Sequence, residues 1–288
     1  MQVDLGSRAT LVILSISQWY GKRVDAKGTR AVAQSLQVDT KDDAYIKRLV
    51  PRSALSNITA LISQVRSYHY DETLAWGDGG IRILPGKNFF AYAQQMSLFK
   101  SRLENMVEAF LQSYPQLVAE AQIYKGNMFD ASEYPEAAVI RSAFAMTTTF
   151  MPFPNAADFR LEIDDDLRTQ LVAETRREYQ AKIDGAMASL YGKFVDLLKE
   201  WDEVLTADKW RASLLDRLKL LCEIAPAQNL LDDAGIEELI KDCEVLAKQT
   251  RVIAPELKSF SSARKLLKDE ARELMTKHGM RDPVKEAA

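Results

Sequence analysis

Histidine and cysteine are the scarcest of the residues that usually carry chemistry, with two of each in a chain of 288 residues. His69 and His278 lie far apart in the sequence, and neither has a cysteine or carboxylate at the spacing of a zinc site. A catalytic triad or a Cys–His pair would need one of these histidines, and the chain has no Gly-x-Ser-x-Gly motif. The composition therefore argues against zinc chemistry and nucleophilic hydrolysis, and we expect no metal and no cofactor.

Long hydrophobic runs are also missing. The apolar stretch at residues 11–16 is too short to span a bilayer, and it lacks the small-residue pattern of a signal cleavage site. Cys222 and Cys243 fall on apolar positions of expected helices, a placement typical of buried reduced thiols. We therefore expect a cytoplasmic protein that makes no membrane contact.

The chain has no overall excess of positive charge, since its net charge is −3, but basic residues outnumber acidic ones near the N-terminus. Residues 1–66 hold ten basic and five acidic residues, a net of +5. The candidate contact residues of this segment are Trp19, Lys22, Arg23 and Arg30, and three more cations follow at Lys47, Arg48 and Arg52. Aromatic rings beside cations are what a single-strand binder uses to stack bases and neutralise phosphates. The alternative is that the rings belong to a core and the cations to a solvated loop.

The first 163 residues are predicted to form an α+β domain. Residues 10–20 are rich in β-branched and aromatic side chains, which favours a strand. Apolar residues recur at steps of three and four over residues 53–68, and again from residue 88 onward, which predicts two helices. Threonines, aromatics and prolines over residues 145–163 favour extended segments that can pair with the first strand.

Residues 164–288 are predicted to form a helical domain. A proline-free helix runs over 166–205, and amphipathic helices follow at 208–223, 233–249 and 262–278. The cap candidates are Asp208, Asp232 or Asp233, and Ser261 or Ser262, while Pro226 and Gly279 mark stops. The expected fold class is therefore α+β and predominantly helical. A small N-terminal mixed α/β unit is followed by long helices packed as a bundle or as a coiled-coil-like hairpin.

One face of the long helix carries a heptad-like seam, because its apolar residues recur at alternating steps of four and three. Its members are Ile183, Met187, Leu190, Phe194, Leu197 and Trp201. Such a seam packs either inside the chain or against a second copy, and a seam of this length suggests a homo-oligomer.

The stretch LAWGDGGIRILPG, residues 74–86, crowds glycines around charged and aromatic residues. Its spacing fits neither a phosphate-binding loop nor a dinucleotide fingerprint, because Arg82 stands where the latter needs glycine. Asp78 and Gly79 suit a tight turn between two short strands, so we expect a β-hairpin. Its candidate contact residues are Trp76 and Arg82.

Acidic residues offer one catalytic alternative, a Mg²⁺-dependent nuclease built on Asp71, Asp78 and Asp158 with their neighbours. The competing interpretation concerns residues 164–166, which stand at the expected start of the long helix. Negative charge there stabilises the helix dipole by about 0.3–1 kcal/mol. We therefore interpret these three aspartates as capping residues.

The run LAWGDGGIRILPGKNFFAYAQQM, followed by FLQSYPQLV, by YP at 134–135 and by MPFPNAADFRLEI, resembles an uncharacterised family of tailed-phage and prophage proteins. Members share a PW-D-G-R-LLP segment before a long helix and a later P…DFR segment. Ala75 stands where the family has proline, and the resemblance covers about residues 10–165. It implies a phage origin and action in the host cytoplasm, but no activity.

The function expected from these features is that of a non-enzymatic phage protein that acts through macromolecular contacts as a homo-oligomer. It would serve as an accessory of phage DNA metabolism or as an inhibitor of a host defence system, with a host or phage protein as its partner. The first alternative is a nucleic-acid-binding protein that uses residues 1–66. The second is the Mg²⁺-dependent nuclease.

Overall fold

The computed structural model describes residues 5–37, 44–77, 79–153 and 164–280. These residues form eight α-helices and two small β-sheets, which confirms the predominantly helical α+β class. The chain divides into two compact units. Unit 1 holds Met1–Ile13, His69–Tyr92 and Thr149–Ala288, and unit 2 holds Leu14–Tyr68 and Ala93–Thr148. The predicted boundary at residue 163 rests on composition. Unit 1 combines stretches from both sides of that boundary, whereas unit 2 contains only residues that precede it.

A four-stranded sheet has the order β4-β5-β1-β6. Its strands are β1 (Ala9–Ser17), β4 (Leu74–Ala75), β5 (Ile81–Pro85) and β6 (Ala145–Met151). β1 runs antiparallel to β5, with Leu11 opposite Ile83. The predicted pairing of the N-terminal strand with the segment after residue 145 is confirmed, because β1 and β6 are neighbours.

The hairpin predicted for residues 74–86 is present. Leu74 lies opposite Ile83 in the antiparallel pair of β4 and β5, and the Trp76 N–H donates to the Ile81 carbonyl. Gly79 has a φ of +86°, a conformation that glycine adopts without the steric penalty of a Cβ. Asp78 itself lies outside the described residues. Leu74 and Ile83 are both buried, so this hairpin is a packing element of unit 1.

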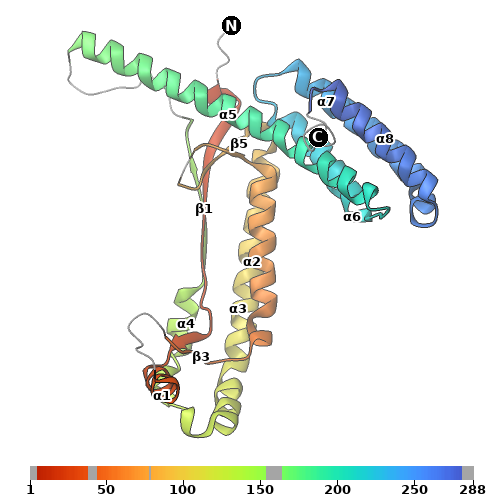
Figure 1. The fold of residues 1–288 in the computed structure, drawn as a ribbon. Helices are drawn as coiled ribbons and strands as arrows, with labels where there is room; N and C mark the ends of the chain where they lie inside the picture. Colours follow the sequence, from red (N-terminus) through yellow and green to blue (C-terminus); the bar gives the residue numbers. More distant parts are fainter. Residues whose placement is uncertain (1–4, 38–43, 78, 154–163, 281–288) are drawn as a thin grey trace. The chain divides into compact units, whose positions relative to one another are not determined.

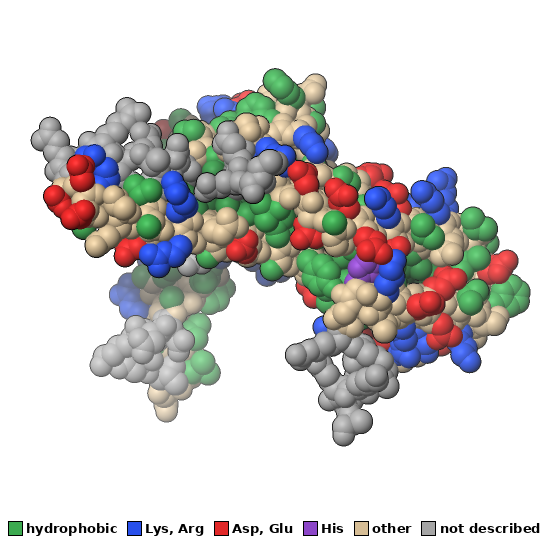
Figure 2. All heavy atoms as spheres, turned by 90° about the horizontal axis from the view of Figure 1, so that it is seen from above, with side chains coloured by type: hydrophobic (Ala, Val, Ile, Leu, Met, Phe, Trp, Pro, Cys, Tyr) green, Lys and Arg blue, Asp and Glu red, His purple; other side chains and the backbone are tan. Residues whose placement is uncertain are grey.

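The C-terminal part of unit 1 is a four-helix bundle (Figure 1). It consists of α5 (Asp165–Thr206), α6 (Ala212–Gln228), α7 (Ala234–Ser259) and α8 (Ser261–Lys277). Each helix contacts its neighbour in sequence, and α5 also contacts α8, which closes the bundle. Figure 2 shows basic and acidic side chains mixed over the helical face that it presents. Among the ion pairs of the bundle is that of Arg264 with Asp208, at 2.7 Å.

Helix termini follow the predicted signals at some positions and depart from them at others. The Asp164 carboxylate accepts from the Asp166 N–H at the start of α5, and the Asp233 carboxylate accepts from the Ile236 N–H at the start of α7. The capping interpretation of the first aspartate cluster is thereby confirmed. Pro226 does not end its helix, because α6 continues to Gln228. A proline this close to a C-terminus removes only one backbone hydrogen bond.

The seam of α5 is buried inside the chain. All six predicted members lie in one hydrophobic cluster with side chains of the other bundle helices: Ile183, Met187, Leu190, Phe194, Leu197 and Trp201. Phe194 and Trp201 have no exposed surface at all. The chain's own helices therefore occupy the face on which the expected homo-oligomer depended, and the oligomer itself stays a prediction.

Unit 2 is built on two long helices that lie side by side (Figure 1), α2 (Arg52–Glu72) and α3 (Phe89–Lys125). The ring of Tyr68 on α2 meets that of Phe99 on α3 at a centroid distance of 5.6 Å. The smaller elements of unit 2 are β2 (Lys22–Val24), α1 (Ala26–Leu36), β3 (Ile46–Arg48), α4 (Ala137–Ala143) and two 3₁₀ turns, η3 (Gly126–Met128) and η4 (Ala131–Glu133). In the described residues of both units, no helix is long and apolar enough to cross a membrane.

Burial of the seam leads to a stability prediction. Replacing Phe194 by alanine leaves a cavity in the bundle, and we expect the free energy of unfolding to fall by about 3–5 kcal/mol. Urea unfolding measures this loss, and light scattering should give the same mass as for the wild type. The control is Leu167→Ala on the same helix, where the side chain is 47% exposed. A Phe194→Ala protein of unchanged stability and smaller mass would instead assign the seam to a contact between copies.

Candidate ligand-binding groove

A groove of about 470 Å³ lies on unit 2, within the size range of ligand pockets in proteins. Aromatic rings, two guanidinium groups, hydroxyls and an apolar floor line it. The lining residues are Trp19, Tyr20, Arg48, Val50, Pro51, Arg52, Leu55, Ser56, Thr59, Ala60 and Ser63. They come from the segment after β1, from the end of β3 and from the first half of α2.

The two aromatic rings of the groove are held in different ways. The Trp19 ring packs against α3, with centroids 5.9 Å from both Phe110 and Tyr114. The Tyr20 ring is 58% exposed, and it makes no ring contact with another described aromatic residue. The groove thus combines a ring fixed by the core of unit 2 with a neighbouring ring that is exposed.

Gly21 creates the turn that separates these rings from β2. Its φ is +61°, and a Cβ at this position would lie 2.7 Å from Val50 Cγ2, which leaves no room for another residue. Its carbonyl accepts a hydrogen bond from the Leu49 N–H at 2.8 Å. The turn therefore fixes the segment of Trp19 and Tyr20 against the segment that follows β3.

β2 and β3 place cations on the rim of the groove. In their antiparallel register Lys22 lies opposite Arg48, so the two side chains leave the same face of the ribbon. Like charges directly opposite each other are destabilising. The Lys22 ammonium also lies 5.4 Å from the centroid of the Tyr20 ring.

These cations have no acidic counterpart in the part of the chain that the structure describes. No described carboxylate forms an ion pair with Lys22, Arg48 or Arg52. Other exposed arginines of the protein do pair, as Arg141 does with Glu108 at 2.6 Å. An anion bound in the groove would therefore relieve a repulsion that the described residues leave uncompensated.

One face of α2 extends the groove along its length. Arg52, Ser56, Thr59 and Ser63 line it at steps of four, three and four, which places them on one side of a helix. From Arg52 to Ser63 the helix rises through eleven steps of 1.5 Å, about 16 Å. That length corresponds to about five stacked nucleotides at 3.4 Å each.

Of the four predicted N-terminal contact residues only Trp19 lines the groove, while Lys22 lies opposite the lining residue Arg48. Arg23 lies opposite the buried Lys47, and Arg30 projects from α1, where its Nε donates to the Ala26 carbonyl. Sequence reasoning missed Tyr20, Arg48 and Arg52 as site residues. The basic composition of residues 1–66 indicated a cationic site in this segment. Only the antiparallel register of β2 and β3 shows which of its cations share a face.

Trp76 and Arg82 both make contacts within unit 1, where Trp76 is buried and Arg82 is partly buried, and their role as partner contacts stays a prediction. Trp76 is 5% exposed, and its ring packs against Phe153 at 4.8 Å between centroids. The Arg82 guanidinium donates to Thr73 Oγ1 at 2.5 Å and to the Thr73 carbonyl at 2.8 Å, and it lies over the Tyr70 ring. These contacts connect β5 to the C-terminal end of α2.

Of the three named acidic candidates for a metal site, the structure describes only Asp71. Asp78 and Asp158 lie outside the described residues, and burial raises the pKa of Asp71. Over the described ranges no group of three histidine, cysteine or acidic side chains is arranged to hold a metal ion. The geometry therefore adds no support to the nuclease alternative.

His69 is a buried histidine close enough to Arg82 to be affected by its charge. It is 3% exposed, and its Nδ1 lies 2.7 Å from the Tyr92 hydroxyl. Burial, together with the positive charge of Arg82, lowers the pKa of His69 to about 4. The imidazole is therefore neutral in the folded protein at neutral pH.

The contacts of Arg82 lead to a prediction about folding. Removing them with Arg82→Ala should lower the free energy of unfolding by about 1.5–3 kcal/mol, the range for hydrogen bonds to charged groups. Thermal and urea unfolding measure the change. Arg217→Ala is the matched control, because its ion pair with Glu200 lies on the surface and should be worth at most about 1 kcal/mol. Equal stability of the two variants would contradict the role assigned to Arg82.

His69 makes stability depend on pH. An unfolded histidine binds its proton near pH 6.5, whereas the folded one does so only near pH 4, so stability falls as the pH drops through this interval. In His69→Asn this part of the pH dependence should disappear, while an amide atom remains near the Tyr92 hydroxyl. Urea unfolding of both proteins between about pH 4 and 7 tests it. Parallel stability curves would refute the assignment.

Comparisons with known proteins leave the groove to be interpreted from its own geometry. No family model matches the chain, and neither a curated protein nor a solved structure matches it. The resemblance to a family of phage proteins stays a prediction that rests on the motifs of residues 74–163. What the fold does supply is a groove with exposed aromatic and cationic side chains, and its ligand has to be inferred from that chemistry.

Proposed function

We propose that the protein is a non-enzymatic binding protein whose groove on unit 2 takes single-stranded nucleic acid. One observation carries this proposal. The cations Lys22, Arg48 and Arg52 lack described carboxylate partners, and they surround the rings of Trp19 and Tyr20. A ligand that offers both phosphates and unstacked bases satisfies both features at once.

Each part of the groove has a distinct role in this binding. The guanidinium groups of Arg48 and Arg52 suit phosphate oxygens, because their planar fork donates two parallel hydrogen bonds. The exposed Tyr20 ring offers a face for a base, and stacking of this kind contributes about 1–3 kcal/mol per base. The hydroxyls of α2 supply further donors along the strand. Because every base has an aromatic face, such binding tolerates any sequence.

A duplex is a poorer ligand for the same groove. Its bases are stacked on one another and are not free to stack on Tyr20, so only the phosphate contacts would remain. The net charge of −3 also disfavours binding over the whole surface and confines the attraction to the groove. In a phage protein, this preference for single strands fits an accessory of phage DNA metabolism.

Salt dependence tests the proposal. Three phosphate contacts on a single strand predict that the affinity for a labelled oligothymidylate of about 15 nucleotides falls with salt, with a logarithmic slope near −2. Arg48→Ala and Arg52→Ala should each weaken binding about tenfold, the loss of one hydrogen bond to a charged group. Each should also reduce the slope by about 0.7. Fluorescence anisotropy at several salt concentrations measures both quantities.

The matched control is Arg102→Ala, which removes an exposed arginine of α3 that does not line the groove. Its affinity and salt slope should equal those of the wild type. Absence of binding at low salt would refute the proposal. Equal losses in all three variants would replace it with a non-specific electrostatic attraction, and tighter binding of a duplex would contradict the role of the aromatic rings.

A further inference from the structure

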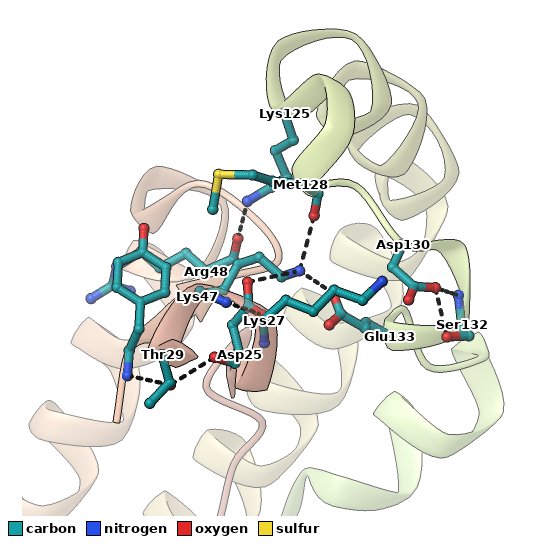
Figure 3. Close-up of polar contacts among 12 residues, drawn as sticks. Asp25, Lys27, Thr29, Lys47, Arg48, Lys125, Met128, Asp130, Ser132 and Glu133 are labelled. Atoms are coloured by element: carbon teal, nitrogen blue, oxygen red, sulfur yellow. Dashed lines mark hydrogen bonds and ion pairs between the residues drawn. The ribbon is translucent and has the colours of Figure 1, made fainter. Parts of the chain in front are cut away.

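One cation beside the groove differs from the others because its charge is fully compensated. The side chain of Lys47 is 5% exposed, and its ammonium pairs with Glu133 and with Asp25, whose Oδ2 lies 3.4 Å away (Figure 3). The same ammonium donates to the Met128 carbonyl at 3.0 Å. Burial disfavours the charged form, but the hydrogen bonds to Glu133 and Asp25 outweigh it and raise the pKa of Lys47.

Strand geometry links this buried lysine to the groove. Successive side chains of a strand leave opposite faces, and in β3 Lys47 is buried while Ile46 and Arg48 are exposed. A slip of one residue would exchange the two faces. Burial of the Lys47 ammonium therefore determines that Arg48 points outward, to the face that lines the groove.

β2 and β3 need such a support, because a two-stranded ribbon is only marginally stable by itself. Each strand has three residues. The connection between α3 and α4 holds β3 through Met128 and Glu133, and the Lys125 ammonium donates to the Arg48 carbonyl (Figure 3). The groove-lining arginine is thus fixed by residues about eighty positions away in the sequence.

The Asp25 carboxylate gives the cluster a second anchor. It accepts from the backbone N–H groups of Lys27 and Gly28, both at 3.0 Å, and so caps α1. The Asp25 N–H in turn donates to the Tyr45 carbonyl, just before β3. Through its carboxylate and its backbone N–H, Asp25 therefore connects the start of α1, the buried ammonium and the approach to β3.

We infer that Lys47 is a positioning residue which, held by Asp25 and Glu133, keeps Arg48 directed into the groove and so sets the affinity for single-stranded nucleic acid. This inference rests on the proposed function, but its structural part can be tested without any ligand. Lys47 itself contacts no ligand, because its donors are already used inside the fold.

The first experiment uses hydrogen exchange of the ligand-free protein. The backbone amides of Asp25 and Leu49 bond across the ribbon, to the Tyr45 and Gly21 carbonyls. In Lys47→Met these two amides should exchange at least about tenfold faster, as a local opening would cause, while amides in the core of α2 and α3 keep their protection. Wild-type protection at both amides would overturn the inference.

A second variant keeps the inference testable should Lys47→Met fail to fold, since it leaves two carboxylates without their cation. The triple variant Lys47→Met, Asp25→Asn, Glu133→Gln removes all three charges, and asparagine at position 25 is still a good helix cap. The same two amides should exchange faster in it. The control is Glu108→Gln, which breaks the exposed pair with Arg141 in the same unit and should change neither amide.

The second experiment is a double-mutant cycle on binding of the oligothymidylate. Lys47→Met and Arg48→Ala should each weaken binding about tenfold and reduce the salt slope by about 0.7. The double variant should bind no more weakly than Arg48→Ala alone, because both changes remove the same contact. Additive losses would overturn the inference. A wild type that binds no oligonucleotide overturns the proposed function instead, and the exchange data still decide whether Lys47 supports β3.

Discussion

Unit 2 depends on the compensation of one buried charge. An ammonium taken out of water is costly unless carboxylates and carbonyls replace the solvent, and Lys47 obtains this from Asp25, Glu133 and Met128. These partners come from the cap of α1 and from the turns after α3. The requirement to pair one ammonium therefore brings three distant stretches of chain together, and it orients the short ribbon of β2 and β3.

Paired and unpaired charges have different roles in this protein. In the bundle of unit 1 the buried Asp202 carboxylate binds Arg272 through two hydrogen bonds, of 2.5 and 3.1 Å, so the pair serves the packing of α5 on α8. On the groove, in contrast, Lys22 and Arg48 face each other across two strands without a described carboxylate. A fold that pairs its buried charges and leaves a cation cluster open beside aromatic rings is suited to hold an anion there.

The sequence predicted the regular elements well and the site only in part. Helical periodicity, the Asp164 and Asp233 caps and the hairpin at residues 74–86 all depend on local interactions, which neighbouring residues specify by themselves. The contacts of Arg82 with Thr73 and Tyr70 were not predicted, because nothing in the local sequence shows that these residues lie within its reach. Tyr20, Arg48 and Arg52 were missed for the same reason, since the pairing of β2 with β3 determines which cations share a face.

By itself, the sequence determined the helical class, the apolar seam of α5 and the basic character of residues 1–66. These properties follow from composition and from periodicities of two or about 3.6 residues. Only the tertiary structure decided that the seam is filled by the chain's own helices, that Lys47 is buried and that Arg48 is exposed. The physical reason is that burial and charge compensation are properties of contacts between distant segments, and these exist only once the chain has folded.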